Sequence, residues 1–109
     1  MCEFQTLHCS NDGYVVRCKE CGHYQIGFGS TMLTLVQKDF QMLCDIVVHK
    51  CAEESFPSSN NCKRVIIPTV CKSMSILLTY NEAIRFNEIL QEADNEMKAL
   101  ELMDMFNSK

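Results

Sequence analysis

The sequence predicts an α+β fold, in which a mostly antiparallel sheet of hairpins is accompanied by two helices. Short runs of β-branched and aromatic residues, separated by turn residues, fill the first third of the chain and return beyond its middle. Two longer stretches, residues 37–54 and 81–107, carry apolar residues at helical spacing. The length suits a single domain, residues 1–109. Within it we distinguish residues 1–54, with a hairpin, strand and helix, from residues 61–109, with a second hairpin and a long helix.

The composition excludes several classes of protein. Apolar residues make up 47% of the chain, which is enough for an ordinary core and too much for a disordered chain. A net charge of −4 disfavours nucleic-acid binding, which usually needs a basic face. The apolar runs are too short to cross a membrane, and the N-terminus lacks the basic and apolar parts of a signal peptide. We therefore expect a cytoplasmic protein whose eight cysteines are reduced or bound to metal.

The first half reads as strands followed by a helix. The dipeptide Asp12-Gly13 is a strong hairpin signal between the first two strands. The predicted strands are residues 2–9, 14–18, 24–28 and 31–36. The helix then begins near Gln37 and ends between residues 52 and 54, because its apolar residues recur on one face: Phe40, Leu43, Ile46 and Val47.

The second half repeats this order in a shorter form. A polar loop containing Pro57 interrupts the chain, and residues 63–67 and 73–79 form a second hairpin. Asn81 is the predicted N-cap of the final helix, which continues to residue 107.

Residues 33–47 resemble residues 76–90 when the chain is shifted by 43 positions. In this alignment Asp39 falls on Glu82, and Ile46 falls on Ile89. The match predicts a possible ββα-ββα duplication with an additional N-terminal strand and with the helices on one face of the sheet. The alternative is that any strand-to-helix junction produces this pattern.

A Cys-x-x-Cys motif formed by Cys18 and Cys21 separates two apolar runs and is followed by Gly22. At a tight turn this spacing places two thiolates about 3.5 to 4 Å apart, as a tetrahedral zinc ion requires. Gly22 lets the backbone N–H groups turn toward the sulfur atoms. We expect a structural, zinc-ribbon-like zinc site with Cys18, Cys21, Cys2 and Cys9 as ligands.

The motif supplies two ligands, and the third and fourth must come singly from elsewhere in the chain. Cys2 lies at the open end of the first hairpin, beside the motif. If Asp12-Gly13 is a two-residue turn, Cys9 faces Val16 and lies roughly 7 Å along the ladder from Cys18. Cys9 then needs a bulge or a longer loop to reach the site. The other candidates are single residues: His8, His23, Cys62 and Cys71.

Two other interpretations of the motif stay open. The cysteines can be reduced, buried thiols at a turn without metal. They can also be a thioredoxin-like dithiol, but such a pair lies at a helix N-terminus, which lowers the thiolate pKa. Here strands are predicted on both sides of the motif, so this activation is missing.

The motif and its surroundings resemble a group of small, functionally uncharacterised bacterial proteins. The matching run extends from Gly13 through the Cys-x-x-Cys to Gly29, then through Leu33-Thr34-Leu35 to Asp39-Phe40. The resemblance covers about residues 2–47 and implies a single-knuckle protein with an acidic and aromatic helix start. It implies no known activity.

The final helix points to a protein partner. At 1.5 Å per residue it is about 40 Å long, more than the roughly 30 Å diameter of a domain of this size. An apolar stripe runs along it and includes Phe86, Leu90, Ala93, Met97, Leu100 and Met103. We expect a homodimer through residues after about Met97, with a different protein partner as the alternative. The competing structure is a helix that breaks near Asp94-Asn95 and folds its tail back on the sheet.

These observations favour a non-enzymatic metal-knuckle interaction module over an enzyme or a thiol redox protein. No catalytic set is evident, because Glu92, Asp94 and Glu96 read as a solvated helix face. A glycine-rich phosphate loop is also missing, since Gly27-Phe28-Gly29 lacks a third glycine and a following helix start.

Overall fold

The computed structural model describes residues 3–52, 65–69 and 73–107, and it confirms the predicted α+β fold. The elements in chain order are β1 (Phe4–Cys9), β2 (Gly13–Cys18), β3 (Tyr24–Phe28), β4 (Thr31–Leu35), α1 (Gln37–Ala52), β5 (Val65–Pro68), β6 (Ser75–Leu78) and α2 (Tyr80–Asn107). Strands β1 to β4 form one antiparallel sheet in chain order, and β5 and β6 pair as a separate hairpin.

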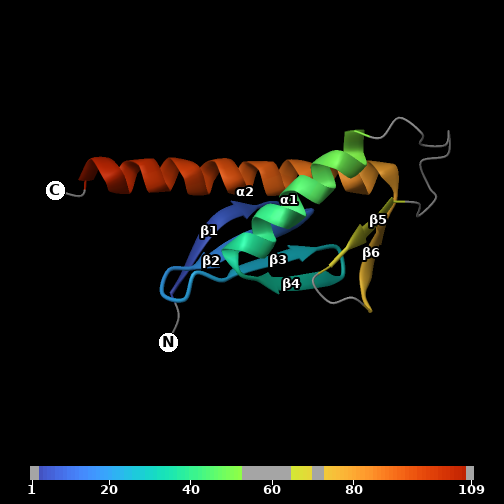
Figure 1. The fold of residues 1–109 in the computed structure, drawn as a ribbon, viewed down its shortest axis with the longest axis horizontal. Coiled ribbons are helices and arrows are strands. Elements are labelled where there is room, and N and C mark those ends of the chain that lie inside the picture. The colour runs from blue at the N-terminus through green and yellow to red at the C-terminus, as the bar shows by residue number, and fades with distance from the viewer. Residues whose placement is uncertain (1–2, 53–64, 70–72, 108–109) are drawn as a thin grey trace.

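Both helices cover the same face of the four-stranded sheet, and the β5–β6 hairpin stands at one end of it (Figure 1). Alternate residues of the strands therefore point into one core under the helices. The Tyr24 ring of β3 stacks on Phe40 of α1 with centroids 4.2 Å apart, and Phe28 of β3 contacts Phe86 of α2 at 4.8 Å. Each such side chain stabilises the fold by about 1.5 to 3 kcal/mol through burial.

The first hairpin differs in register from the predicted one. Cys9 pairs with Tyr14 rather than with Val16, because the turn is centred on Asn11-Asp12 instead of Asp12-Gly13 and is closed by a 2.9 Å bond from the Ser10 N–H to the Gly13 carbonyl. The register then shifts again between Thr6 and His8. This β-bulge allows Leu7 to turn its side chain into the core, where it is 6% exposed.

The two strand–helix junctions match at the shift of 43 residues. Both helices begin at equivalent positions, and the bonds from the Phe40 N–H to the Val36 carbonyl and from the Ala83 N–H to the Thr79 carbonyl are both 2.9 Å long. The hairpins before them differ, since Leu35 pairs with a residue 11 positions earlier and Leu78 with one 13 positions earlier. The first half also has two additional strands, β1 and β2. The similarity is confined to the strand–helix junction.

Helix α2 runs without a break for 28 residues, which confirms the predicted long helix and excludes the alternative of a break near Asp94-Asn95. Its length is about 42 Å, and the molecule measures 54 × 26 × 25 Å. Its C-terminal end extends past the sheet (Figure 1). Within the described ranges, no helix combines the length and the apolar character that a membrane span needs.

The N-cap of α2 is Thr79, and the prediction of Asn81 is wrong. The Thr79 hydroxyl accepts the Glu82 N–H at 3.1 Å, and a Glu82 carboxylate oxygen accepts the Thr79 N–H at 2.9 Å. These two bonds form a capping box, in which each residue satisfies a backbone donor of the other. Asn81 lies one residue inside the helix and is exposed.

This capping box predicts the effect of two matched substitutions. Thr79→Ala should lower the free energy of unfolding by about 1 kcal/mol, because it leaves a backbone donor in the first turn without its partner. Asn81→Ala, two positions away, should change it by less than about 0.5 kcal/mol. Urea unfolding followed by circular dichroism measures both. Equal destabilisation by the two variants would contradict the assignment of Thr79.

Candidate functional site

The Cys-x-x-Cys motif forms the turn between β2 and β3. The Cys18 N–H donates to the His23 carbonyl at 2.8 Å, and the Gly22 N–H donates to the Cys18 carbonyl at 2.9 Å. The Cys21 N–H lies 3.4 Å from the Cys18 sulfur and donates to it. Gly22 has a φ of 77°, which side-chain-bearing residues rarely adopt. A backbone N–H directed at a cysteine sulfur and a left-handed glycine are the features we expect of a metal knuckle.

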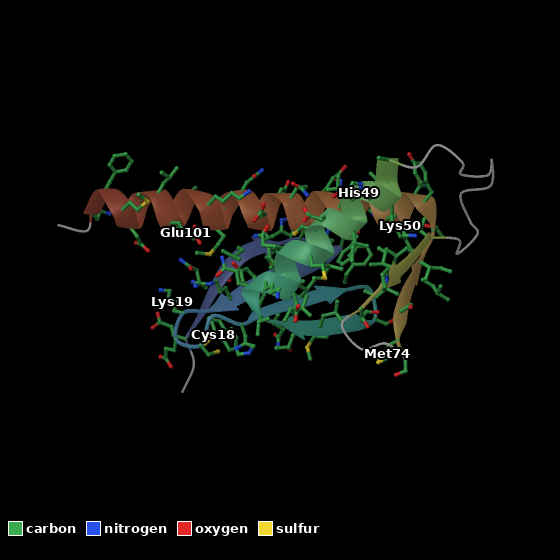
Figure 2. All side chains as sticks on the ribbon, in the orientation of Figure 1. Cys18, Lys19, His49, Lys50, Met74 and Glu101 are labelled. Atoms are coloured by element: carbon green, nitrogen blue, oxygen red, sulfur yellow. The ribbon has the colours of Figure 1, made fainter. Side chains whose placement is uncertain are left out.

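The two cysteines of this turn differ in exposure. Cys18 is 1% exposed, whereas Cys21 is exposed at the tip. The start of β1 lies beside the turn, because Phe4 pairs with Cys18 and the Lys19 N–H donates to the Glu3 carbonyl at 2.9 Å. Figure 2 shows Cys18 and Lys19 at this end of the molecule. Cys2, the predicted third ligand, lies outside the described residues.

The structure does not bring Cys9 to the turn. Cys9 is at the opposite end of the β1–β2 ladder, where it pairs with Tyr14. Cys18 lies four positions after Tyr14 along β2, which is about 13 Å of strand. The bulge in β1 moves the register by one residue and does not shorten this separation.

The histidine candidates have different surroundings. Nδ1 of His8 lies 2.6 Å from a Glu92 carboxylate oxygen on α2, and its Nε2 lies 2.9 Å from the Ser10 hydroxyl. His8 therefore joins β1 to α2 rather than facing the Cys-x-x-Cys turn. His23 is half-buried within the turn itself. Cys62 and Cys71 lie outside the described residues.

Across residues 3–52, 65–69 and 73–107, no three His, Cys, Asp or Glu side chains are grouped so that they could hold a metal ion. Cys18 and Cys21 alone would supply two of the four ligands of a tetrahedral site. Their chemistry fits zinc, which prefers thiolate and imidazole ligands. Strands flank the motif on both sides, so the helix N-terminus that activates a redox dithiol does not precede or follow it.

A buried carboxylate joins the two helices, and the prediction of a solvated face is wrong for this residue. Asp94 of α2 is 7% exposed, the one buried charged side chain in the described part of the chain. It accepts from Gln41 Nε2 of α1 at 2.8 Å and from Lys98 Nζ at 2.9 Å. The sequence spacing does indicate this burial. Asp94 follows Leu90 by four residues and precedes Met97 by three, so it lies on the core-facing side of the helix.

Cys44 of α1 lies near this carboxylate, within the core. Burial, reinforced by the charge of Asp94, raises the pKa of the Cys44 thiol to about 12. The thiol is therefore neutral at physiological pH and behaves as a small apolar side chain. We assign Asp94, Gln41 and Cys44 to the contact between the helices and not to chemistry.

The apolar stripe of α2 is divided between its own core and the solvent. Phe86, Leu90, Ala93 and Met97 are buried in the domain, and Leu100 is partly buried against it. The turns beyond expose four large apolar side chains, between 55% and 77% exposed: Leu102, Met103, Met105 and Phe106.

The core-facing positions of these last turns are acidic. Glu101 and Asp104 follow Met97 by four and seven residues, so they lie on the same face of the helix as Met97. The exposed apolar side chains therefore occupy the sides and back of the overhanging end, and not a straight continuation of the stripe. Met103, which the sequence pattern placed in the stripe, therefore lies off the core-facing side of the helix.

These features define a small α+β domain with a Cys-x-x-Cys turn at one end of its sheet and a helix that projects beyond it. The chain belongs to the family of unknown function DUF6686, whose model matches residues 1–108. The match extends over both halves of the chain, and it carries no evidence for a metal knuckle or for a bacterial origin. No curated protein and no solved structure matches it.

The thiols of Cys44 and Cys9 should react at very different rates. At about pH 8 the Cys44 thiol is almost wholly protonated in the folded protein, since burial raises its pKa to about 12. Cys9 is exposed. We expect Ellman's reagent to modify Cys9 rapidly in native protein and Cys44 only after unfolding, as peptide mass mapping would show. Modification of Cys44 at the rate of Cys9 would contradict its burial.

Proposed function

We propose that this protein is a non-enzymatic interaction module whose contact surface is the projecting end of α2. The observation that carries the proposal is the exposure of Leu102, Met103, Met105 and Phe106 on turns that none of the described strands covers. Four large apolar side chains within five residues form a concentrated patch on a monomer surface. Burying each of them contributes about 1.5 to 3 kcal/mol, so association relieves a costly exposure.

A second copy of the chain is the partner that fits this surface best. Two α2 ends can lie antiparallel, so that each covers the apolar side chains of the other, and most soluble oligomers have this two-fold symmetry. Glu101 and Asp104 face the chain's own sheet side and stay clear of such a contact. Lys98 lies at the start of the projecting segment and carries a charge opposite to that of Glu101 and Asp104.

The second part of the proposal is that the Cys-x-x-Cys turn is a structural zinc knuckle. Its support is the N–H bond to the Cys18 sulfur and the left-handed Gly22. The start of β1 pairs with Cys18 through Phe4, and Cys2 precedes Phe4 by two residues in the sequence. His23 or a residue outside the described ranges is then the fourth ligand. Zinc would link the open end of the first hairpin to the turn, and cytoplasmic conditions would keep its thiols reduced.

The metal prediction is tested by elemental analysis of purified protein. We expect about one zinc ion per chain, loss of zinc in Cys18→Ser and Cys21→Ser, and a lower melting temperature in both, because structural zinc contributes folding free energy. Cys9→Ser is the matched control and should retain zinc, since Cys9 lies at the other end of the ladder. Metal-free protein whose stability a chelator does not change would refute the knuckle. A Cys18–Cys21 disulfide that cycles with a reductant would favour the redox alternative.

The assembly prediction is tested by light scattering on the full chain. At micromolar concentration we expect a dimer for the wild type and a monomer for the triple variant Leu102→Gln, Met105→Gln and Phe106→Gln. Each substitution should weaken dimerisation about tenfold or more. All three sites are exposed, so the melting temperature of the monomer should change little.

Met32→Gln is the control for assembly, because Met32 is 61% exposed on β4 of the sheet. It should leave the dimer intact. A wild-type monomer at about 10 μM, or a dimer that survives the triple substitution, would rule out self-association through α2.

A further inference from the structure

A hollow of about 320 Å³ opens between the sheet and the projecting half of α2. Its walls come from the first two strands, the Cys-x-x-Cys turn and the helix: Gln5, Arg17, Lys19, Met97, Leu100 and Asp104. Figure 2 shows Lys19 and Glu101 at this end of the molecule and Lys50 toward the other. A hollow of this size reaches the range of small-molecule sites, with donors on one wall and apolar side chains on the other.

Arg17 is the residue that makes this hollow unusual. Its guanidinium carbon lies 6.0 Å from the centre of the Tyr24 ring, at the limit of a cation–π contact. Its Nε is buried and has no hydrogen-bond partner among the described residues, and none of their carboxylates forms an ion pair with it. A guanidinium presents five donors in a fixed fork that fits carboxylate and phosphate oxygens.

The platform beneath Arg17 is rigid. The Tyr24 ring is fully buried and stacks on Phe40 with only 5° between the ring planes. Its hydroxyl also lacks a hydrogen-bond partner within the described ranges. Burial raises the pKa of Tyr24, so the phenol stays neutral and does not neutralise the arginine. Among the described residues, Arg17 therefore has neither an ion-pair partner nor an ionised phenol beside it.

The other charges of the hollow do not satisfy Arg17. Lys19 is 3.3 Å from a Glu3 carboxylate oxygen and so has a partner of its own. Asp104 lies on the helix wall and forms no ion pair with Arg17. Gln5 pairs with Arg17 across the β1–β2 ladder and adds an amide donor on the same wall. Met97 and Leu100 complete the opposite side with apolar atoms.

We propose that this hollow binds a small molecule that carries a phosphate or carboxylate group on an apolar body. The terminal nitrogens of Arg17 hold the oxyanion, with Gln5 beside them. Met97 and Leu100 contact the apolar body. This site is separate from the exposed apolar end of α2, and it stands whether or not the protein forms a dimer or binds zinc.

Two probes that differ in their charged group test the proposal, phenyl phosphate and benzoate. Calorimetric titration of the full chain should show saturable binding of at least one of them. The probe that binds more tightly shows whether the site prefers a phosphate or a carboxylate group. Arg17→Gln should weaken that binding about tenfold or more, because a charge-assisted hydrogen-bonded pair is lost. Arg17→Lys, which keeps the charge but loses the fork, should weaken it less. Asp104→Asn should strengthen it, since it removes a negative charge from the wall.

Lys50→Gln is the matched control, because it removes one positive charge at a distance from the hollow, on the last turn of α1. It should bind both probes as the wild type does. If neither probe saturates by about 20 mM, or if Arg17→Gln binds like the wild type, the site is not an oxyanion site. Should Arg17→Gln fail to fold, weaker binding by Arg17→Lys together with tighter binding by Asp104→Asn supports the proposal, and unchanged binding in both overturns it.

Discussion

The contact between the buried face of α2 and the rest of the domain is the interaction on which the structure depends. Phe86 packs against Phe28 of the sheet. The following turns of α2 bury Leu90, Ala93 and Met97 against α1 and the first two strands. Polar groups fix the position of the helix. Asp94 accepts from Gln41 of α1, and Glu92 lies 2.6 Å from His8 of β1. Apolar burial supplies the free energy here, while the buried carboxylate selects one way of packing the two helices.

The same helix also explains both candidate surfaces. The sheet is shorter than α2, so the last turns of the helix extend beyond the apolar face of the described strands. Glu101 and Asp104 occupy the core-side positions of these turns, where water can solvate them. The hollow lies between these turns and the sheet, and Arg17 forms part of its sheet wall. The large apolar residues of the same turns point away from the sheet. One helix thus offers a polar hollow on its inner side and an apolar surface on its outer side.

The Cys-x-x-Cys turn lies at the end of the sheet past which α2 projects, and it joins β2 to β3 there. Its backbone bonds hold β2 to β3, and the Lys19 N–H ties the start of β1 to the turn. Arg17 precedes this turn by one residue, and its terminal nitrogen is 4.0 Å from the position of a Cβ at Gly22. Zinc at the knuckle and an oxyanion at Arg17 would therefore both stiffen one end of the molecule, next to the projecting helix.

The sequence by itself determined the elements of this protein, because their signals are local. Periodicity predicted four early strands, a helix from Gln37, a second hairpin and an uninterrupted final helix, and Gly22 marked the turn. The capping box at Thr79 was also readable, since Glu82 follows three residues later. The tertiary structure alone decided the bulge at Leu7, the burial of Asp94 and the hollow at Arg17. Each depends on a partner far along the chain, as with Gln41, 53 residues from Asp94, and no local pattern specifies such a partner.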